Sequence, residues 1–248
     1  MGVLLTVAYD GTDYNGWQVQ KNGTTVCGLL EGALAGVLAG RSFSILGASR
    51  TDAGVHALGQ RVHLRTDGTI PIPLDRLPNV INAALPRDVA VTAAISVPDS
   101  FHPISDAKSK TYIYKIHNQP HRCPLRCRYS AFIPNALDFA AMQPACRHFV
   151  GEFDFAAFCA TGSPVKSTVR RINFLEVSQQ EQDGLLEMRV NGNGFLYNMV
   201  RIIAGTLVGV GLNKILPDDI PAIIAGKDRA KAGKTMPPQG LTLLEVFY

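Results

Sequence analysis

Residues 43–66 read FSILGASRTDAGVHALGQRVHLRT and contain two strand patterns around a glycine-rich loop. We expect strands at 43–49 and 60–66, and in the second strand Val62 and Leu64 alternate with basic residues. The loop between them carries Asp52, the only acid between Glu31 and Asp67. Because a segment this rich in glycine and charge does not build a core, its carboxylate is a candidate for chemistry.

The segments on either side of this pair complete a regular order of elements. Apolar periodicity predicts a strand at 3–9, a helix at 25–39, a helix at 74–85 and a strand at 89–97. The order is therefore β-α-β-β-α-β, the ferredoxin-like arrangement in which helices cover one face of an antiparallel sheet. The other face is left to bind a partner.

After Pro98 the chain begins a second pass of the same kind. We expect an α+β protein with two ferredoxin-like halves, 1–103 and 104–248, joined edge to edge into one extended mixed or antiparallel sheet. Helices would lie on one face, and the loop with Asp52 would lie in a central cleft where the halves meet. The expected elements of the second half are strands at 108–117, 129–133, 169–178, 184–192 and 241–247, and helices at 136–150, 195–211 and 218–225.

Composition limits the class of protein. The chain has 248 residues, of which 46% are apolar, enough for a substantial core, and its net charge of +4 permits a polyanionic partner without requiring one. Its five cysteines have no framework spacing, which indicates free thiols in a reducing compartment. The N-terminal residues do not resemble a signal peptide, so we expect a cytoplasmic protein.

Two further patterns have simple interpretations. Cys123, Cys127 and His121 resemble half of a zinc site, but no second pair with ligand spacing follows, so no metal is expected. The apolar stretch from Phe195 contains Asn198, Arg201 and a Gly205/Gly209 pair, and we interpret it as a core helix and not a membrane span.

Asp52 allows two interpretations. Arg50 would share a face with it in an extended segment, and a neighbouring cation keeps a partly buried aspartate ionised, as a nucleophile or base requires. The alternative is an ordinary turn in which Asp52 caps a backbone amide. Asp10 and Asp13 could join Asp52 around a divalent metal, although acids in glycine-rich turns usually serve the turn itself.

The basic residues of the 60–66 strand and two tyrosines also have alternatives. Arg61, His63 and Arg65 share one strand face, which suits phosphates, but a solvated edge strand explains them equally well. Tyr112 and Tyr114 share a strand face among lysines, which is typical either of a surface that stacks bases or of ordinary packing.

Arg201 lies within an apolar helix and therefore needs a partner. A carboxylate from another segment would satisfy it, and Asp52 is our candidate. The alternative is that Arg201 extends to the surface.

These residues resemble one family, the TruA-type tRNA pseudouridine synthases, over essentially the whole chain. The resemblance rests on motifs that occur in the family's order: YDGTDYNGWQVQ (9–20), GASRTDAGVHALGQ (47–60), NAALPRDVAV (82–91), FH (101–102), KTYIYKI (110–116), GEFDFAAF (151–158), NGNGFLYNMVRIIAGTLVGVG (191–211) and GLTLLEV (240–246). The RTDAGVHA core is highly specific.

The resemblance implies an isomerase that converts uridine to pseudouridine in the tRNA anticodon arm, at positions 38, 39 and 40, without cofactor or metal. Asp52 matches the family's nucleophile and Tyr112 its substrate-stacking tyrosine. Arg50 matches the arginine that helps to extrude the target nucleotide, and Arg201 the arginine paired with the aspartate. A homodimer is also implied, with RNA bound in the central cleft.

The chain departs from the family's pattern at one place, and its residues also allow two other functions. After FH the family continues with a small residue, arginine, an aromatic residue and serine, whereas this chain reads PISDA at 103–107. A non-catalytic RNA-binding protein on the same fold is the first alternative to the enzyme. A metal-dependent nuclease that uses Asp10, Asp13 and Asp52 is the second.

Overall fold

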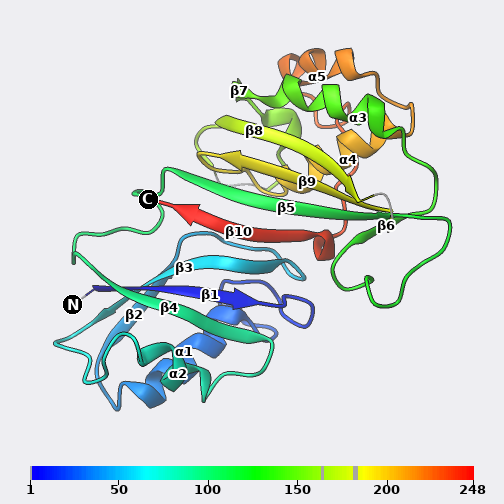
Figure 1. Ribbon diagram of the computed structural model, residues 1–248. Helices are drawn as coiled ribbons and strands as arrows, with labels where there is room; N and C mark the ends of the chain where they lie inside the picture. Colours follow the sequence, from blue (N-terminus) through cyan, green and yellow to red (C-terminus); the bar gives the residue numbers. More distant parts are fainter. Residues whose placement is uncertain (1, 163–164, 181–183) are drawn as a thin grey trace. The chain divides into compact units, whose positions relative to one another are not determined.

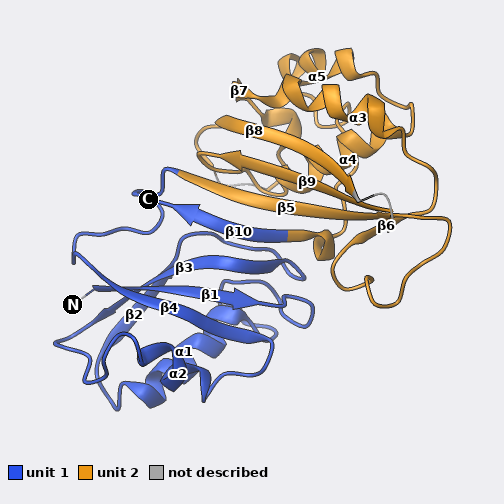
Figure 2. Cartoon of the chain, in the orientation of Figure 1, with its two compact units in different colours: residues 1–108, 242–248 blue, residues 109–241 orange. Residues whose placement is uncertain are grey.

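The computed structural model describes residues 2–162, 165–180 and 184–248. The chain forms two compact units, coloured separately in Figure 2. Unit 1 contains residues 1–108 and 242–248, and unit 2 contains residues 109–241. Unit 1 thus includes a strand that a linear division of the chain assigns to the second half.

Unit 1 has a sheet in the predicted ferredoxin-like order. Strand β1 (Gly2–Tyr9) lies between β3 (His56–Thr66) and β4 (Val89–Val97) and runs antiparallel to both. Strand β2 (Phe43–Gly47) is antiparallel to the far half of β3, pairing with residues 62–66. Strand β10 (Leu241–Phe247) runs parallel to the first residues of β3, where Thr242 pairs with His56.

The helices of unit 1, α1 (Val26–Val37) and α2 (Leu77–Asn82), lie on the same side of its strands (Figure 1). Thr25 begins α1 by accepting a hydrogen bond from the amide of Gly28, and the periodic Leu30 and Leu34 are fully buried. Pro78 falls in the first turn of α2, where its missing N–H costs nothing. It therefore does not interrupt the helix.

Unit 2 repeats part of this arrangement. Strand β9 (Leu185–Gly192) lies between β5 (Ser109–Asn118) and β8 (Val169–Gln180), antiparallel to both. The order β5-β9-β8 therefore matches the order β1-β3-β2 of unit 1. The short strand β6 (Ala131–Ile133) runs parallel to β5, and β7 (Gly151–Asp154), which the sequence did not predict, is antiparallel to β8.

Two helices of unit 2 are shorter than predicted. Helix α3 (Phe139–Ala145) ends just after Pro144, which cannot donate to the helix, and the chain continues as the 3-10 helix η1 (Cys146–Phe149). Helix α4 (Met199–Gly211) begins late because Asn198 has a left-handed φ of 60°. The remaining elements are η2 (Ala156–Phe158), η3 (Pro217–Asp219), α5 (Ile220–Gly226) and η4 (Pro238–Gly240).

The core of unit 2 centres on α4, almost all of which is buried. A side chain at Gly205 would overlap the carbonyl oxygen of Lys234, so this small residue serves a close approach of two backbone segments. None of the helices in the described residues is long and apolar enough to span a bilayer. The predictions of a core helix here and of an α+β protein are confirmed.

Candidate active site

Asp52 lies in the loop 48–55 that connects β2 with β3 in unit 1. The amide of Val55 donates to the carbonyl of Asp52 at 3.1 Å, which closes a four-residue turn. Gly54, the third residue of the turn, has a φ of +77°, the conformation that a type II turn requires there. The hydrogen bond that closes the turn uses the backbone of Asp52, and the side chain of Asp52 is half-buried.

Residues 9–17 hold this loop through hydrogen bonds. The amide of Trp17 donates to the carbonyl of Thr51 at 3.1 Å, and the amide of Gly54 donates to the carbonyl of Tyr14 at 3.3 Å. The hydroxyls of Tyr9 and Thr51 are 2.7 Å apart. The segments YDGTDYNGW and SRTDAG, recognised as separate motifs, are therefore one structural assembly.

Glycines allow the two segments to come this close. A Cβ atom on Gly11 would overlap the carbonyl oxygen of Val55. Gly16 has a φ of +81°, and a Cβ atom there would lie 2.5 Å from the carbonyl oxygen of Thr51. Both positions therefore exclude side chains for steric reasons.

Gln60 fixes the other limb of the loop. Its fully buried side-chain amide donates to the carbonyl of Ser49 at 2.6 Å and accepts from the amide of Ser49 at 3.2 Å. Arg50, the next residue, is exposed, whereas Asp52 is half-buried. The backbone is thus held on both sides of Arg50 and Asp52.

Asp10 serves local structure, as the turn interpretation predicts. Its Oδ1 accepts from the amide and hydroxyl of Thr12, at 3.0 and 2.5 Å, and lies 3.1 Å from Nδ1 of His56. That Nδ1 also accepts the amide of Gly11 at 3.0 Å. Because Nδ1 accepts the hydrogen bond of this buried amide, it carries no hydrogen with which to donate to Asp10.

The metal hypothesis receives no support from these acids. In the described part of the chain, no group of three or more His, Cys, Asp or Glu side chains is arranged to hold a metal ion. Asp13 is exposed, and Asp10 is engaged by Thr12.

The interpretation of Arg61, His63 and Arg65 as a solvated edge strand is wrong. Strand β3 pairs with β1 on one side and with β2 and β10 on the other, so it is a central strand. His63 is only 2% exposed, and burial, with a smaller contribution from Arg65, lowers its pKa. Arg61 is half-buried and donates to the hydroxyl of Thr6 at 2.7 Å, which leaves Arg65 as the exposed member.

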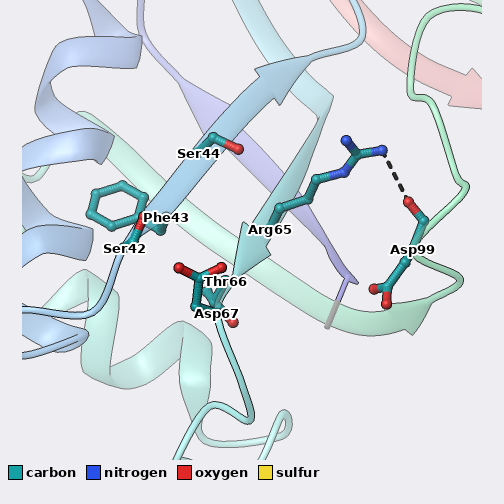
Figure 3. Close-up of a pocket in the computed structure, with 7 residues that line it drawn as sticks. All are labelled: Ser42, Phe43, Ser44, Arg65, Thr66, Asp67 and Asp99. Carbon is teal, nitrogen blue, oxygen red and sulfur yellow. Dashed lines mark hydrogen bonds between the residues drawn. The ribbon is translucent and has the colours of Figure 1, made fainter.

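A cavity of about 390 Å³ lies at the other end of β2 and β3, away from the 48–55 loop (Figure 3). Arg65, one of the residues that line it, extends towards Asp99 and donates to the carbonyl of that residue at 3.0 Å. Neither Arg50 nor Asp52 contributes to its wall, so it is separate from the predicted site. The lining residues are Ser42, Phe43, Ser44, Arg65, Thr66, Asp67 and Asp99.

In unit 2, the two tyrosines of β5 have different environments. Tyr112 is 6% exposed, and its ring meets that of Phe195 edge to face, with centroids 5.2 Å apart. Tyr114 is fully buried and donates to the carbonyl of Pro237 at 2.7 Å, and burial raises its pKa against the opposing effect of Arg201. For Tyr114 the ordinary packing interpretation is therefore correct.

Lys110 precedes Tyr112 by two residues and shares its strand face. Its side chain is partly buried, and desolvation lowers the pKa of its ammonium group to about 8. Nothing in the sequence distinguishes this lysine from Lys108 and Lys115.

Arg201 lies in the first turn of α4 and is half-buried. Its Nε donates to the carbonyl of Met236 and its Nη1 to the side chain of Asn198, both at 2.7 Å. The short segment 195–198 therefore contacts Tyr112 through Phe195 and Arg201 through Asn198. Because Asp52 belongs to unit 1, its pairing with Arg201 stays a prediction.

Comparison with known proteins gives the family. A family model described as tRNA pseudouridine synthase matches residues 5–104 and 145–248. The chain belongs to the tRNA pseudouridine synthase family. It is thus an isomerase that acts on tRNA. The matched segments include Arg50, Asp52 and Arg201, but residues 105–144, with Tyr112, lie between them.

Relatives named "tRNA pseudouridine synthase A" are similar over nearly their full length. The protein from Ruminiclostridium cellulolyticum is 48% identical, that from Geotalea uraniireducens 47%, and that from Caldicellulosiruptor saccharolyticus 44%. Each alignment covers 99% of both chains.

Sequence reasoning missed the supporting roles of Gln60, Phe195 and Asn198. Gln60 and Asn198 stand within recognised motifs, but only the folded chain reveals what their amides contact. The departure PISDA forms a local turn in which Nδ1 of His102 accepts from the amides of Ile104 and Ser105, and Asp106 accepts from the amide of His102. The segment that replaces the family's pattern thus satisfies its own hydrogen bonds.

Proposed function

We propose that this protein isomerises uridine to pseudouridine at positions 38, 39 and 40 of the tRNA anticodon arm, with Asp52 as the nucleophile. The proposal needs no metal, nucleotide cofactor or energy source. The observation that carries it is the loop around Asp52. This loop falls within a segment matched by the family model, and hydrogen bonds fix its backbone on both sides of Asp52.

The reaction requires a group that can act on the sugar or the base. The bond between C1′ and N1 breaks, the uracil turns, a bond forms between C1′ and C5, and the C5 proton is lost as N1 gains one. Atoms therefore balance without a co-reactant. A carboxylate can attack the sugar or the base covalently or remove a sugar proton, and all three routes use Asp52 in its ionised form.

The other predicted residues have supporting roles in this proposal. Arg50 is exposed and can enter the gap left by the extruded nucleotide. Tyr112 stacks on the uracil, an interaction of about 1–3 kcal/mol per base. Arg201 keeps the Asp52 carboxylate charged.

We further propose that the protein acts in the cytoplasm as a homodimer. The expected free thiols agree with a reducing compartment, and the five cysteines are all unpaired. Sedimentation equilibrium tests the assembly, and a single-chain mass at micromolar concentrations would contradict the dimer.

The test of the catalytic proposal is Asp52→Asn, assayed by tritium release from tRNA labelled at C5 of uridine. We expect tRNA binding within about twofold of wild type and a rate reduced at least about 1,000-fold, because the amide is neither a nucleophile nor a base. Asp13→Asn, which changes an exposed acid in the neighbouring segment, is the matched control.

Three outcomes would contradict parts of this proposal. Near-wild-type tritium release by Asp52→Asn removes the nucleophile. Loss of release after treatment with a chelator contradicts the metal-free reaction. Pseudouridine at sites other than 38–40, mapped in cellular tRNA with and without the protein, contradicts the assigned positions.

A further inference from the structure

Residues 119–130, QPHRCPLRCRYS, connect β5 with β6 and are called the basic loop below. No acidic residue occurs between Asp106 and Asp138, a stretch of 31 residues that contains three lysines and three arginines. The three arginines, Arg122, Arg126 and Arg128, all lie in the basic loop. The stretch therefore carries more net positive charge than the whole chain, whose net charge is only +4.

The basic loop has defined local structure. The amide of Arg126 donates to the carbonyl of Cys123, and the amide of Tyr129 donates to the carbonyl of Arg126, both at 3.0 Å. The hydroxyl of Ser130 donates to the same Arg126 carbonyl at 2.9 Å. Two successive turns therefore set the direction of the chain from 123 to 130.

The two cysteines of the basic loop are free. The thiol of Cys127 donates to the carbonyl of Pro124 at 3.0 Å, a contact within the loop itself. The Cys127 thiol, one of the two whose spacing resembles half of a zinc site, is thus engaged within the loop.

The basic loop presents both cations and apolar groups to solvent. Leu125 is 89% exposed and Tyr129 is 49% exposed, while Arg122 and Arg128 are also exposed. The guanidinium carbon of Arg122 lies 5.9 Å from the centroid of the Phe132 ring, so this arginine also contacts β6. Arginines interleaved with an aromatic side chain are typical of surfaces that hold RNA phosphates and unpaired bases.

The position of the basic loop separates it from Tyr112, the residue that the proposed function places against the target nucleotide. It begins directly after β5, and the end of β5 is six residues beyond Tyr112, or about 20 Å along an extended strand. It also lies in the segment 105–144, between the two segments that the family model matches. Neither the chemistry assigned to Asp52 nor the family match accounts for its charge.

We propose that the basic loop binds backbone phosphates of the tRNA at a distance from the target uridine, through Arg122, Arg126 and Arg128. The inference rests on tRNA as the substrate of the proposed function. It assigns the loop to affinity and placement of the RNA, with no part in bond breaking.

The test compares two triple variants that remove the same charge. Arg122→Gln/Arg126→Gln/Arg128→Gln changes the basic loop, and Arg76→Gln/Arg87→Gln/Lys214→Gln removes three exposed cations elsewhere. The Kd for unmodified tRNA is measured from about 50 to 200 mM KCl, and the single-turnover rate is measured with saturating enzyme.

We expect the loop variant to raise Kd at least about 10-fold and to reduce the slope of log Kd against log salt by about two to three, one for each lost phosphate contact. Its single-turnover rate should stay within about twofold of wild type, because the saturated complex still presents the uridine to Asp52. The control variant should change Kd less than about threefold.

Three results would overturn the inference: a Kd equal to that of wild type, an equal rise in both triple variants, or a lost rate at saturation with unchanged Kd. The first would point to a protein partner for the exposed Leu125. Arg122→Gln/Arg128→Gln, which retains the half-buried Arg126, guards against a misfolded loop and should show about two thirds of the change in slope.

The binding measurement needs no turnover, so the inference and the proposed function fail separately. If the loop variant loses salt-dependent binding but the wild-type protein releases no tritium, the function assigned to Asp52 is refuted and the role of the basic loop is supported. If the wild-type protein releases tritium normally and the loop variant binds tRNA as wild type does, the proposed function is supported and the inference about the basic loop is refuted.

Discussion

The two units share a strand order, β1-β3-β2 in unit 1 and β5-β9-β8 in unit 2, but hold their candidate site residues by different means. In unit 1, Asp52 lies on a loop whose position depends on backbone contacts with residues 9–17. In unit 2, Tyr112 and Arg201 lie on a strand and a helix, and side chains of Phe195 and Asn198 complete their surroundings. A reactive group on a loop needs a second segment to immobilise it, whereas one on a regular element is already placed.

Gly11→Ala should have the largest effect, because it acts on the backbone contact that distinguishes unit 1. The added methyl group would overlap the carbonyl of Val55, and neither backbone segment can move without breaking hydrogen bonds. We expect a loss of about 3 kcal/mol or more in the free energy of unfolding and a loss of tritium release. Urea denaturation and the activity assay measure the two effects.

Gly36→Ala in α1 is the matched control, since its added methyl group meets no atom within 4 Å. Helix propensity should make this variant about 0.5–1 kcal/mol more stable, with unchanged activity. If the two alanine variants behave alike, the close backbone contact is not what holds the loop of unit 1.

Lys110→Met tests whether the buried ammonium group near Tyr112 lowers the free energy of unfolding. Desolvation lowers the pKa of Lys110 from 10.5 to about 8, so at neutral pH the folded protein holds a buried charge that is unfavourable. The methionine variant should therefore be more stable at about pH 7, by about 3 kcal/mol.

The pH dependence gives the sign. Between the two pKa values the unfolded chain binds a proton that the folded chain has lost, so the contribution of Lys110 to stability rises with pH. The advantage of Lys110→Met should be full below about pH 8 and should decline towards about pH 10.5. A difference in unfolding free energy that does not change with pH would show that Lys110 is solvated in the folded state.

Gln60→Leu should have the smallest of the three effects. It removes the two hydrogen bonds between the Gln60 side-chain amide and the part-buried backbone of Ser49, at a cost of about 2 kcal/mol. Because the limb before Arg50 is then less constrained, we expect a lower rate at saturating tRNA with little change in Kd. A changed Kd with a normal rate would place the role of Gln60 in binding.

Local patterns predicted most of the elements that carry the site. The strands on either side of the Asp52 loop, the helix that begins after Thr25 and the strand that holds Tyr112 all follow from periodicity and capping residues. Their limits differ from expectation where single residues act, at Pro144 and at the left-handed Asn198. The four-residue β7 is too short to give a period.

What could not be predicted depends on partners distant in the sequence. The basic face of β3 resembled an edge strand because nothing in residues 60–66 reveals that β1 pairs with one side of this segment while β2 pairs with the other. Likewise, Gly11 and Gly16 look like ordinary turn glycines until the carbonyls of Val55 and Thr51 are found beside them. Periodicity predicts which face of the sheet a side chain lies on, but it does not predict which strands pair with its own.

The pairing of β10 with β3 has a consequence for biosynthesis. Residues 2–97 contain every strand and helix of the ferredoxin-like pattern in unit 1, yet His56 and Ala57, directly after the Asp52 loop, pair with Thr242 and Leu243. A nascent chain that has not reached residue 242 can therefore form that pattern while the strand leading out of its reactive loop still lacks one neighbour. Competence for catalysis would then arrive late in translation, after nearly all of unit 2 has been made.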